Sequence, residues 1–173
     1  MHIRPVILCL AIAASAPCAF GQSPAPKLSE TGPDFVRLAS QDGMTEVQLG
    51  KMALTKSSNP DIKSFANRMV KDHSKANRQL SAIATKQGIA VSHNLDAEHA
   101  AMLKEMSDKS GAEFDAAYTQ DMVSDHKKAI ALFENEETDT DPGLASFAKS
   151  TLPVLLEHQK LAQQLTNKMA QNQ

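Results

Sequence analysis

Apolar and small residues recur every three or four positions along most of the 173-residue chain, a spacing that predicts amphipathic helices. It predicts four long helices and one short helix, over about 34–57, 60–87, 95–107, 112–137 and 142–170. Asn59 and Pro60 are typical of a helix start, because Asn caps the first turn and Pro fits there. Gly88 is typical of a helix end. No segment alternates as a half-buried strand does, so the pattern predicts an all-α fold.

The lengths of the connections predict how these helices are arranged. Short connections at 58–59 and 138–141 join neighbouring long helices into two antiparallel hairpins. The connection over 88–111 is much longer, whereas the helix before it spans about 40 Å. Such a linker, part helix and part extended, can return along the bundle. We therefore expect a four-helix bundle with a long crossover that contains the short helix and makes the second and third long helices parallel.

The first 21 residues have the pattern of a signal peptide. A short basic start precedes an apolar run over 6–14, and small residues then lead to Gly21, after which we expect cleavage. The apolar run is short of the ~20 residues that span a membrane, and no later stretch approaches that length. The sequence therefore predicts a periplasmic or otherwise exported protein whose mature chain has no transmembrane segment.

The remaining composition fits one small exported domain. Residues 22–33 are rich in Pro and Ser and predict a flexible leader, and residues 34–170 form one domain. Cys9 and Cys18 both lie in the expected signal peptide, so the mature chain has no disulfide to use. The formal net charge is −2, and lysines alternate with acidic residues. This distribution gives no basic patch for a nucleic acid.

Each long helix carries an ionisable residue where an apolar one is expected. At 100° per residue, His73, His126 and His158 fall within the apolar faces of their helices, and Glu46 lies on the inward face of the first helix. Buried carboxylates and imidazoles are costly unless they are paired. The four residues therefore predict a polar layer in the middle of the bundle.

The repeated string Met-Val-x-Asp-His-x-Lys-Ala, at 69–76 and 122–129, adds a sulfur atom near two of these histidines. Met69 and Met122 each lie four residues before a histidine, one turn away on the same face. Thioether and imidazole together suit copper, and Cu(I) in particular. Counting along the helices places Glu46 and the two repeat histidines at one height, and His158 about a turn away. We therefore predict a site for copper or another transition metal, with the candidate ligands His73, His126, Met69, Met122, Glu46 and His158.

The alternative is a polar layer without a metal, in which hydrogen bonds set the register of the helices. In that case the histidines bond to carboxylates of the bundle, which are Glu46, Asp42, Asp72 or Asp125. Simpler interpretations apply to three other polar residues. His93 and His99 are expected on the solvated surface, and Tyr118 is expected as a core ring whose hydroxyl group is hydrogen-bonded.

Four segments resemble the domain-of-unknown-function 4142 family: MTEVQLGKMA (44–53), FANRMVKDHSKAN (65–77), FDAAYTQDMVSDHKKAIALF (114–133) and FAKSTLPVLLEHQKLA (147–162). The resemblance extends over about 34–170. The family consists of bacterial envelope or exported proteins with a ferritin-like helical bundle. The resemblance therefore implies the bundle, the crossover and export, but it implies no activity.

A di-iron centre is not expected, although the fold is ferritin-like. Such centres use Glu-x-x-His motifs, whereas Val70, Val123 and Leu155 stand three residues before the histidines. Exported four-helix proteins of domain of unknown function 305 are similar in carrying Met and His on bundle helices, and that group is associated with copper. We therefore favour a binding or envelope stress-related module of unassigned activity, with an envelope protein as a candidate partner. A purely structural or partner-binding bundle is the alternative, and a redox enzyme is disfavoured.

Overall fold

The computed structural model describes residues 31–139 and 141–171, and all regular secondary structure in these ranges is helical. The elements are α1 (Gly32–Lys56), α2 (Pro60–Lys86), α3 (Ala97–Asp108), α4 (Gly111–Glu136) and α5 (Pro142–Gln171). The expected signal peptide and its cleavage after Gly21 lie outside the described residues. Helix α1 begins two residues before the expected start at 34, because Pro33 occupies its first turn, where a missing N–H group costs no hydrogen bond.

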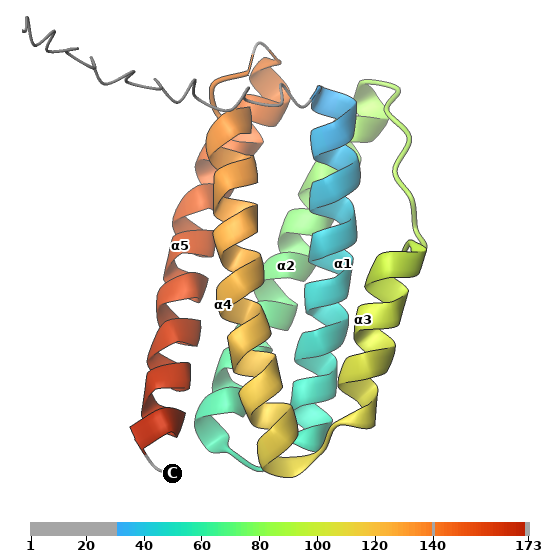
Figure 1. The fold of residues 1–173 in the computed structure, drawn as a ribbon. Helices are drawn as coiled ribbons and strands as arrows, with labels where there is room; N and C mark the ends of the chain where they lie inside the picture. Colours follow the sequence, from blue (N-terminus) through green and yellow to red (C-terminus); the bar gives the residue numbers. More distant parts are fainter. Residues whose placement is uncertain (1–30, 140, 172–173) are drawn as a thin grey trace, which may run out of the picture.

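The four long helices form the expected bundle, and α3 lies outside it (Figure 1). Helices α1 and α5 run in one direction and α2 and α4 in the other, so the predicted parallel pair and crossover are confirmed. The most extensive packing is within the pairs α1–α2 and α4–α5. The crossover brings α3 against α1 and, less extensively, against α4. This arrangement places the middles of all four long helices around one axis.

Side-chain caps explain where several helices begin. The Asn59 side chain accepts a hydrogen bond from the backbone of Asp61 at 2.9 Å, and Pro60 takes the first position of α2. Asp141 caps α5 in the same way, accepting bonds from the backbone of Gly143 and Leu144 at 2.8 Å. Gly88 follows α2 with a φ of 70°, a conformation that favours glycine.

The interior contains two apolar clusters that meet at the middle of the bundle. The upper cluster consists of Phe35, Val36, Ala39, Leu80, Ala84, Ala129, Ile130, Phe133, Leu144, Phe147, Ala148 and Leu155. The lower cluster consists of Leu49, Ala53, Ile62, Phe65, Ala66, Met69, Met106, Phe114, Tyr118, Met122 and Ala162. On every long helix, the residues of one cluster are separated from those of the other by Glu46, His73, His126 or His158. The polar residues therefore lie at the boundary between the clusters.

Two glycines let α1 approach α2 closely on either side of Glu46. A Cβ atom at Gly50 would lie 2.8 Å from Cγ2 of Val70 and 3.2 Å from the backbone oxygen of Ala66. A Cβ atom at Gly43 would lie 2.1 Å from Oδ1 of Asn77. In the structure, the absence of both side chains brings α1 near enough for Glu46 to reach α2.

None of the helices in the described part of the chain combines the length and hydropathy that a membrane span requires.

Candidate metal centre

The four predicted polar residues meet in the middle of the bundle, each from a different long helix. His126 and His158 are fully buried, and the exposed fractions of Glu46 and His73 are 3% and 5%. The expectation that His158 lies a turn away is wrong, because its ring contacts the rings of both other histidines. Its height depends on how α5 is placed after the turn that follows α4. Counting residues within one helix does not include that displacement.

Three ring nitrogens converge at this point. Nε2 of His73 lies 3.2 Å from Nδ1 of His158, and Nε2 of His126 lies 3.4 Å from the same atom. A nitrogen from each of the three histidines lies within 4.8 Å of the other two. We refer to His73, His126 and His158 as the histidine triad. Three imidazoles that share one small region of a buried core form a potential ligand set for a metal ion.

The opposite ring nitrogen of each histidine contacts an oxygen that can only accept a hydrogen bond. His73 Nδ1 lies 2.8 Å from Oε2 of Glu46. His126 Nδ1 lies 2.9 Å from the backbone oxygen of Met122, and His158 Nε2 lies 3.1 Å from Oδ2 of Asp72. Carboxylate and carbonyl oxygens do not donate, so each of these nitrogens carries the hydrogen. In the neutral rings, the three converging nitrogens therefore present lone pairs to one another.

In the metal-free protein, one added proton reduces the repulsion between these lone pairs. Burial alone would lower the pKa of His73, but the charge and hydrogen bond of Glu46 outweigh it and raise that pKa above its ordinary value. Burial and the charge of His73 lower the pKa of His158 to about 4, and burial also lowers that of His126. His73 is therefore the ring that keeps a second proton to the highest pH, and in this state its Nε2–H group donates to Nδ1 of His158.

Glu46 supplies the negative charge that balances this proton. Burial would raise the pKa of its carboxyl group, but the charges of His73 and His126 and the hydrogen bond from His73 lower the pKa to about 2. Its Oε1 atom lies 3.3 Å from Nδ1 of His126, whose hydrogen points at the Met122 carbonyl instead. Oε1 accepts no hydrogen bond from any residue that the structure describes. Glu46 thus serves as a hydrogen-bond partner of the histidine triad, and its second carboxylate oxygen accepts no hydrogen bond from the described residues.

Two of the three distances between the converging nitrogens fit a shared metal ion. Imidazole nitrogens bind Zn²⁺ at about 2.0–2.1 Å, so two of them at a tetrahedral angle lie about 3.3–3.4 Å apart. The two N···N distances of 3.2 and 3.4 Å are close to this value. Metal-binding histidines also characteristically donate their other N–H group to a carboxylate or carbonyl oxygen. All three members of the histidine triad do so.

The two methionines of the repeat lie in the core next to the histidine triad. Met69 and Met122 are fully buried and belong to the lower apolar cluster, one helical turn from the histidines. The backbone oxygen of Met122 accepts a hydrogen bond from Nδ1 of His126 and so orients this ring. The geometric group of converging nitrogens consists of His73, His126 and His158.

The structure assigns three aspartates that the sequence offered only as alternatives. Asp72, whose side chain is 26% exposed, orients His158. Asp42 pairs with His99, and Asp125 pairs with Lys128 at 3.0 Å. The side chains of Asp42 and Asp125 therefore line a neighbouring pocket, and their partners are His99 and Lys128 instead of the histidine triad. No local signal in the sequence distinguishes these roles, because all three residues lie at the edges of helix stripes.

Two other expectations for polar residues are wrong. His99 is not solvated surface, because its Nδ1 lies 2.7 Å from Asp96 and its Nε2 lies 3.1 Å from Asp42. Burial would lower its pKa, but the hydrogen bonds to the two carboxylates raise it. Tyr118 is a fully buried core ring as expected, but its hydroxyl group has no hydrogen-bond partner among the described residues. Packing against Phe114 and Phe65 surrounds this ring with apolar atoms.

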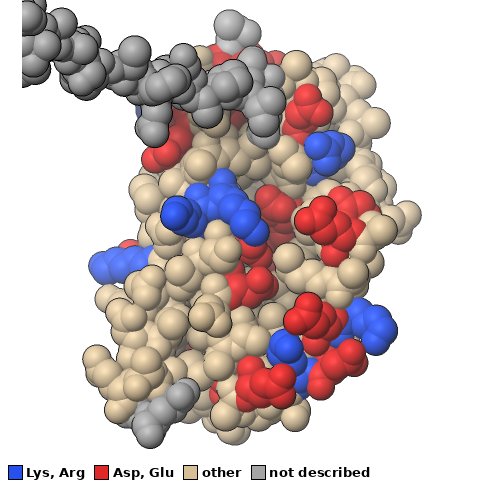
Figure 2. Space-filling view, in the orientation of Figure 1, with Lys and Arg blue, Asp and Glu red and all other residues tan. Residues whose placement is uncertain are grey.

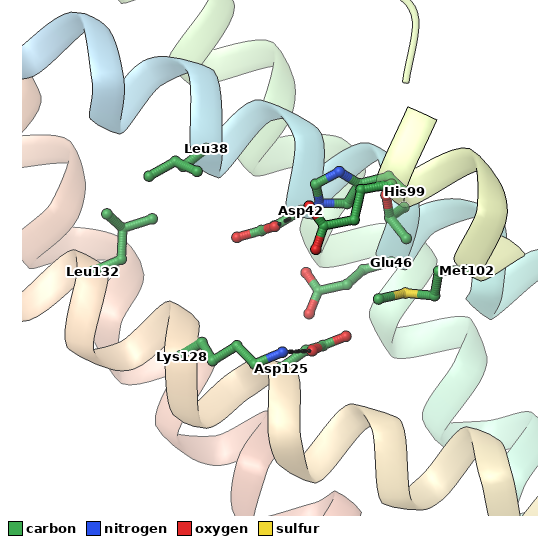
Figure 3. A pocket seen from close by; sticks show the side chains of 10 residues that line it. Leu38, Asp42, Glu46, His99, Met102, Asp125, Lys128 and Leu132 are labelled. Carbon is green, nitrogen blue, oxygen red and sulfur yellow. Dashed lines mark hydrogen bonds and ion pairs between the residues drawn. The ribbon is translucent and has the colours of Figure 1, made fainter. Parts of the chain in front are cut away.

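A pocket of about 290 Å³ lies beside the histidine triad, between α1, α3 and α4. Its lining includes Asp42, Glu46, Glu98 and Asp125. Figure 3 shows the carboxylates of Asp42, Glu46 and Asp125 directed into one open space. In Figure 2, acidic side chains follow the middle of this face of the molecule, with basic ones beside them. Glu46 therefore belongs both to the pocket and to the buried polar layer.

The sequence profile of the family described as domain of unknown function (DUF4142) matches residues 18–165. The chain therefore belongs to this family, as the resemblance indicated. A search of curated proteins gives no match.

Three solved structures share the fold. CopM in its Cu(I)-bound form has a TM-score of 0.67 and 15% identity, over 80% of this chain and 96% of CopM. CopM in its Cu(II)-bound form has a TM-score of 0.67 and 16% identity, over 79% and 96% of the two chains. A DUF305 fragment from Deinococcus radiodurans has a TM-score of 0.71 and 16% identity, over 84% and 99%. At these identities the similarity concerns the fold.

Proposed function

We propose that this member of the DUF4142 family binds one transition-metal ion, of the copper type, at His73, His126 and His158. The observation that carries the proposal is the arrangement of the three rings. Their inner nitrogens converge, while every outer nitrogen donates to an oxygen atom. An ion at the centre would accept all three lone pairs at once and replace the shared proton.

Two considerations favour copper among the ions that imidazole binds. In the usual order of affinities for divalent ions, Cu²⁺ binds such a site more tightly than Zn²⁺ or Ni²⁺. The fold is also shared by CopM, which has been solved in Cu(I)-bound and Cu(II)-bound forms. A purely nitrogen-donor set of three imidazoles accommodates either oxidation state in a three-coordinate or four-coordinate geometry.

We infer a binding role in preference to a catalytic one. The triad is shielded from solvent, with exposed fractions of 0–5%, and its converging nitrogens face one another instead of the neighbouring pocket. Such a site suits a protein that holds or carries a metal. Export to the periplasm or beyond, as the sequence of residues 1–21 suggests, belongs to the same proposal. It is tested by identifying the N-terminus of the mature protein, which should be Gln22.

A structural polar layer is the second candidate, and one observation favours it. With His73 protonated, a continuous chain of hydrogen bonds runs from Glu46 through His73 and His158 to Asp72. This chain links α1, α2 and α5 without any metal. Such a network could fix the register of the helices as its only role.

Equilibrium titration separates the two candidates. The purified mature protein is titrated with Cu(I), Cu(II) and Zn(II), and stoichiometry and melting temperature are measured. We expect one ion per chain, and a stabilisation of about 2.7 kcal/mol at a free-ion concentration of 100 times the dissociation constant. The His73→Gln/His126→Gln double variant should lose this binding.

His93→Gln is the matched control, because His93 is exposed and lies outside the triad. This variant should bind as the wild type does. Absence of a melting-temperature shift with all three ions would exclude the metal site. Unchanged affinity in the double variant would exclude the triad as its location. A loss of stability in the double variant, without metal binding by the wild type, would support the structural layer instead.

A further inference from the structure

The histidine triad is almost completely shielded from solvent, so an ion must reach it through a particular part of the surface. The polar layer approaches the surface on two sides. On one side, between α2 and α5, Asp72 is 26% exposed and bonds to His158. On the other side, the pocket between α1, α3 and α4 ends at Glu46. The two sides differ in the charges that an approaching cation meets.

The pocket presents negative charge to a cation. Four carboxylates line it, those of Asp42, Glu46, Glu98 and Asp125, and the basic groups in the lining are Lys128 and His99. The Lys128 side chain is 71% exposed and extends from the surface to Asp125. A concave site in which one sign of charge predominates raises the local concentration of the opposite ion and its rate of association.

The opposite side presents a cation of its own. Arg68 lies 3.6 Å from Asp72 and 3.8 Å from Glu157. Its guanidinium group therefore stands directly over the Asp72 carboxylate, and that carboxylate contacts the outer nitrogen of His158 instead of the converging one. An ion that came from this side would have to displace an arginine and pass around an imidazole ring.

Glu46 joins the pocket to the triad. Its side chain is 4% exposed, and its Oε2 atom holds Nδ1 of His73. Its Oε1 atom accepts no hydrogen bond from the described residues, and Figure 3 shows the carboxylate pointing into the pocket. A buried carboxylate oxygen without a partner is costly. A cation in the pocket would supply the partner that Oε1 lacks.

We propose that the acidic pocket is the route by which a metal cation reaches the histidine triad, with Asp42 and Asp125 collecting the ion and Glu46 Oε1 holding it before transfer. The inference rests on the proposed metal binding and adds the path and its residues. Glu46 acts as a transient oxygen ligand at the inner end of the pocket, and the ion then moves to the three nitrogens. The pocket is therefore a kinetic element, whereas the triad determines affinity.

Blocking the pocket tests this route. In a chain with Cys9→Ser and Cys18→Ser, Leu132→Cys places one thiol at the pocket wall, where Figure 3 shows Leu132 across the hollow from Leu38. The thiol is capped with a bulky maleimide. Leu156→Cys with the same cap is the matched control, because Leu156 is 47% exposed on α5 and is not part of the pocket lining. Cu(II) is then mixed rapidly with each protein, and quenching of the single tyrosine, Tyr118, is followed in a chain without tryptophan.

A blocked route slows arrival and departure equally and leaves the equilibrium unchanged. We expect the association and dissociation rate constants of the capped Leu132→Cys variant to fall about tenfold each, with a dissociation constant within about twofold of the wild type. The capped Leu156→Cys variant should keep both rate constants. Unchanged kinetics in the capped Leu132→Cys variant, at normal equilibrium binding, would overturn the proposed route. So would equal slowing in the two capped variants.

Charge removal at each side gives an independent test. Lys128→Gln should raise the Cu(II) association rate constant about threefold at low ionic strength, with the effect disappearing in high salt. Arg68→Gln should leave it unchanged. Acceleration by Arg68→Gln alone would place the route between α2 and α5 and overturn the proposal. Failure of the proposed metal site can be distinguished from failure of the proposed route, because the uncapped wild type would then bind no Cu(II) at equilibrium. That result would overturn the route as well.

Discussion

One proton should leave the histidine triad for each metal ion that binds near pH 6. The metal competes for the lone pairs that this proton occupies, since histidine binds a metal through a deprotonated nitrogen. His73 is the protonated member, because Glu46 raises its pKa above the ordinary value of 6.5. The pKa of His158 is lowered to about 4 and that of His126 is lowered as well, so these two rings lose their second proton at lower pH than His73 does.

The pH dependence of the metal affinity follows from the release of one proton per bound ion. Below the raised pKa of His73, each fall of one pH unit should weaken metal binding about tenfold, which corresponds to about 1.4 kcal/mol. Above that pKa, His73 is neutral and the affinity should stop depending on pH. A second proton should begin to compete only as the pH approaches the lowered pKa values of the other two rings.

Isothermal titration calorimetry measures the released proton directly. Cu(II) or Zn(II) is titrated at pH 5.5, 6.0 and 6.5 in two buffers with different enthalpies of ionisation. The difference between the observed enthalpies gives the number of protons transferred to the buffer. We expect a value near one at pH 5.5 and 6.0, and a dissociation constant that rises about tenfold per pH unit as the pH falls.

Glu46→Gln is the control for the physical cause. Glutamine keeps a hydrogen-bond acceptor near His73 but removes the charge that raises its pKa, while burial, which lowers that pKa, remains. The pKa of His73 should then fall below 6.5, and the proton release at pH 6.5 should disappear. Release of no proton by the wild type at pH 5.5, or of two or more at pH 6.5, would refute the assigned protonation of the triad.

Further predictions concern the surroundings of the triad. Asp72→Asn should weaken metal binding about 10–100-fold in the same titration, because the partner that orients His158 loses its charge. Gly50→Ala should lower the free energy of unfolding by about 1–3 kcal/mol in urea denaturation, since its Cβ would meet the backbone of α2, whereas Gly43→Ala should cost less because a side chain can rotate away. Tyr118→Phe should leave the free energy of unfolding unchanged or raise it by up to about 1 kcal/mol, because the hydroxyl group is buried without a partner in the described residues. A loss of more than about 1 kcal/mol there would indicate a hydrogen bond.

The agreement between sequence and structure is best for features that depend on one helix at a time. The apolar spacing and the caps at Asn59 and Gly88 predicted the helices to within about two residues. The inward positions of Glu46, His73 and His126 followed from angles around a single axis. These properties are local, because 3.6 residues complete each turn whatever the rest of the chain does.

The tertiary structure decided how the helices are displaced relative to one another. That displacement places His158 level with His73, 85 positions away along the chain, where counting from the helix start placed it a turn away. It also decides that Asp72 serves His158 while Asp42 pairs with His99. Helical periodicity contains no information on axial shifts, because these depend on close approaches such as that of Gly50 to α2.

The repeated histidine motif shows which features of the site the sequence determined and which depended on packing between helices. From the sequence alone, its histidines were inward and its methionines were candidate ligands on the same face. Side-chain rotation, set by contacts with other helices, turned three ring nitrogens toward one point and three toward oxygen acceptors. A sequence determines which residues face the core, whereas only packing among four helices determines which atom of each residue faces which partner.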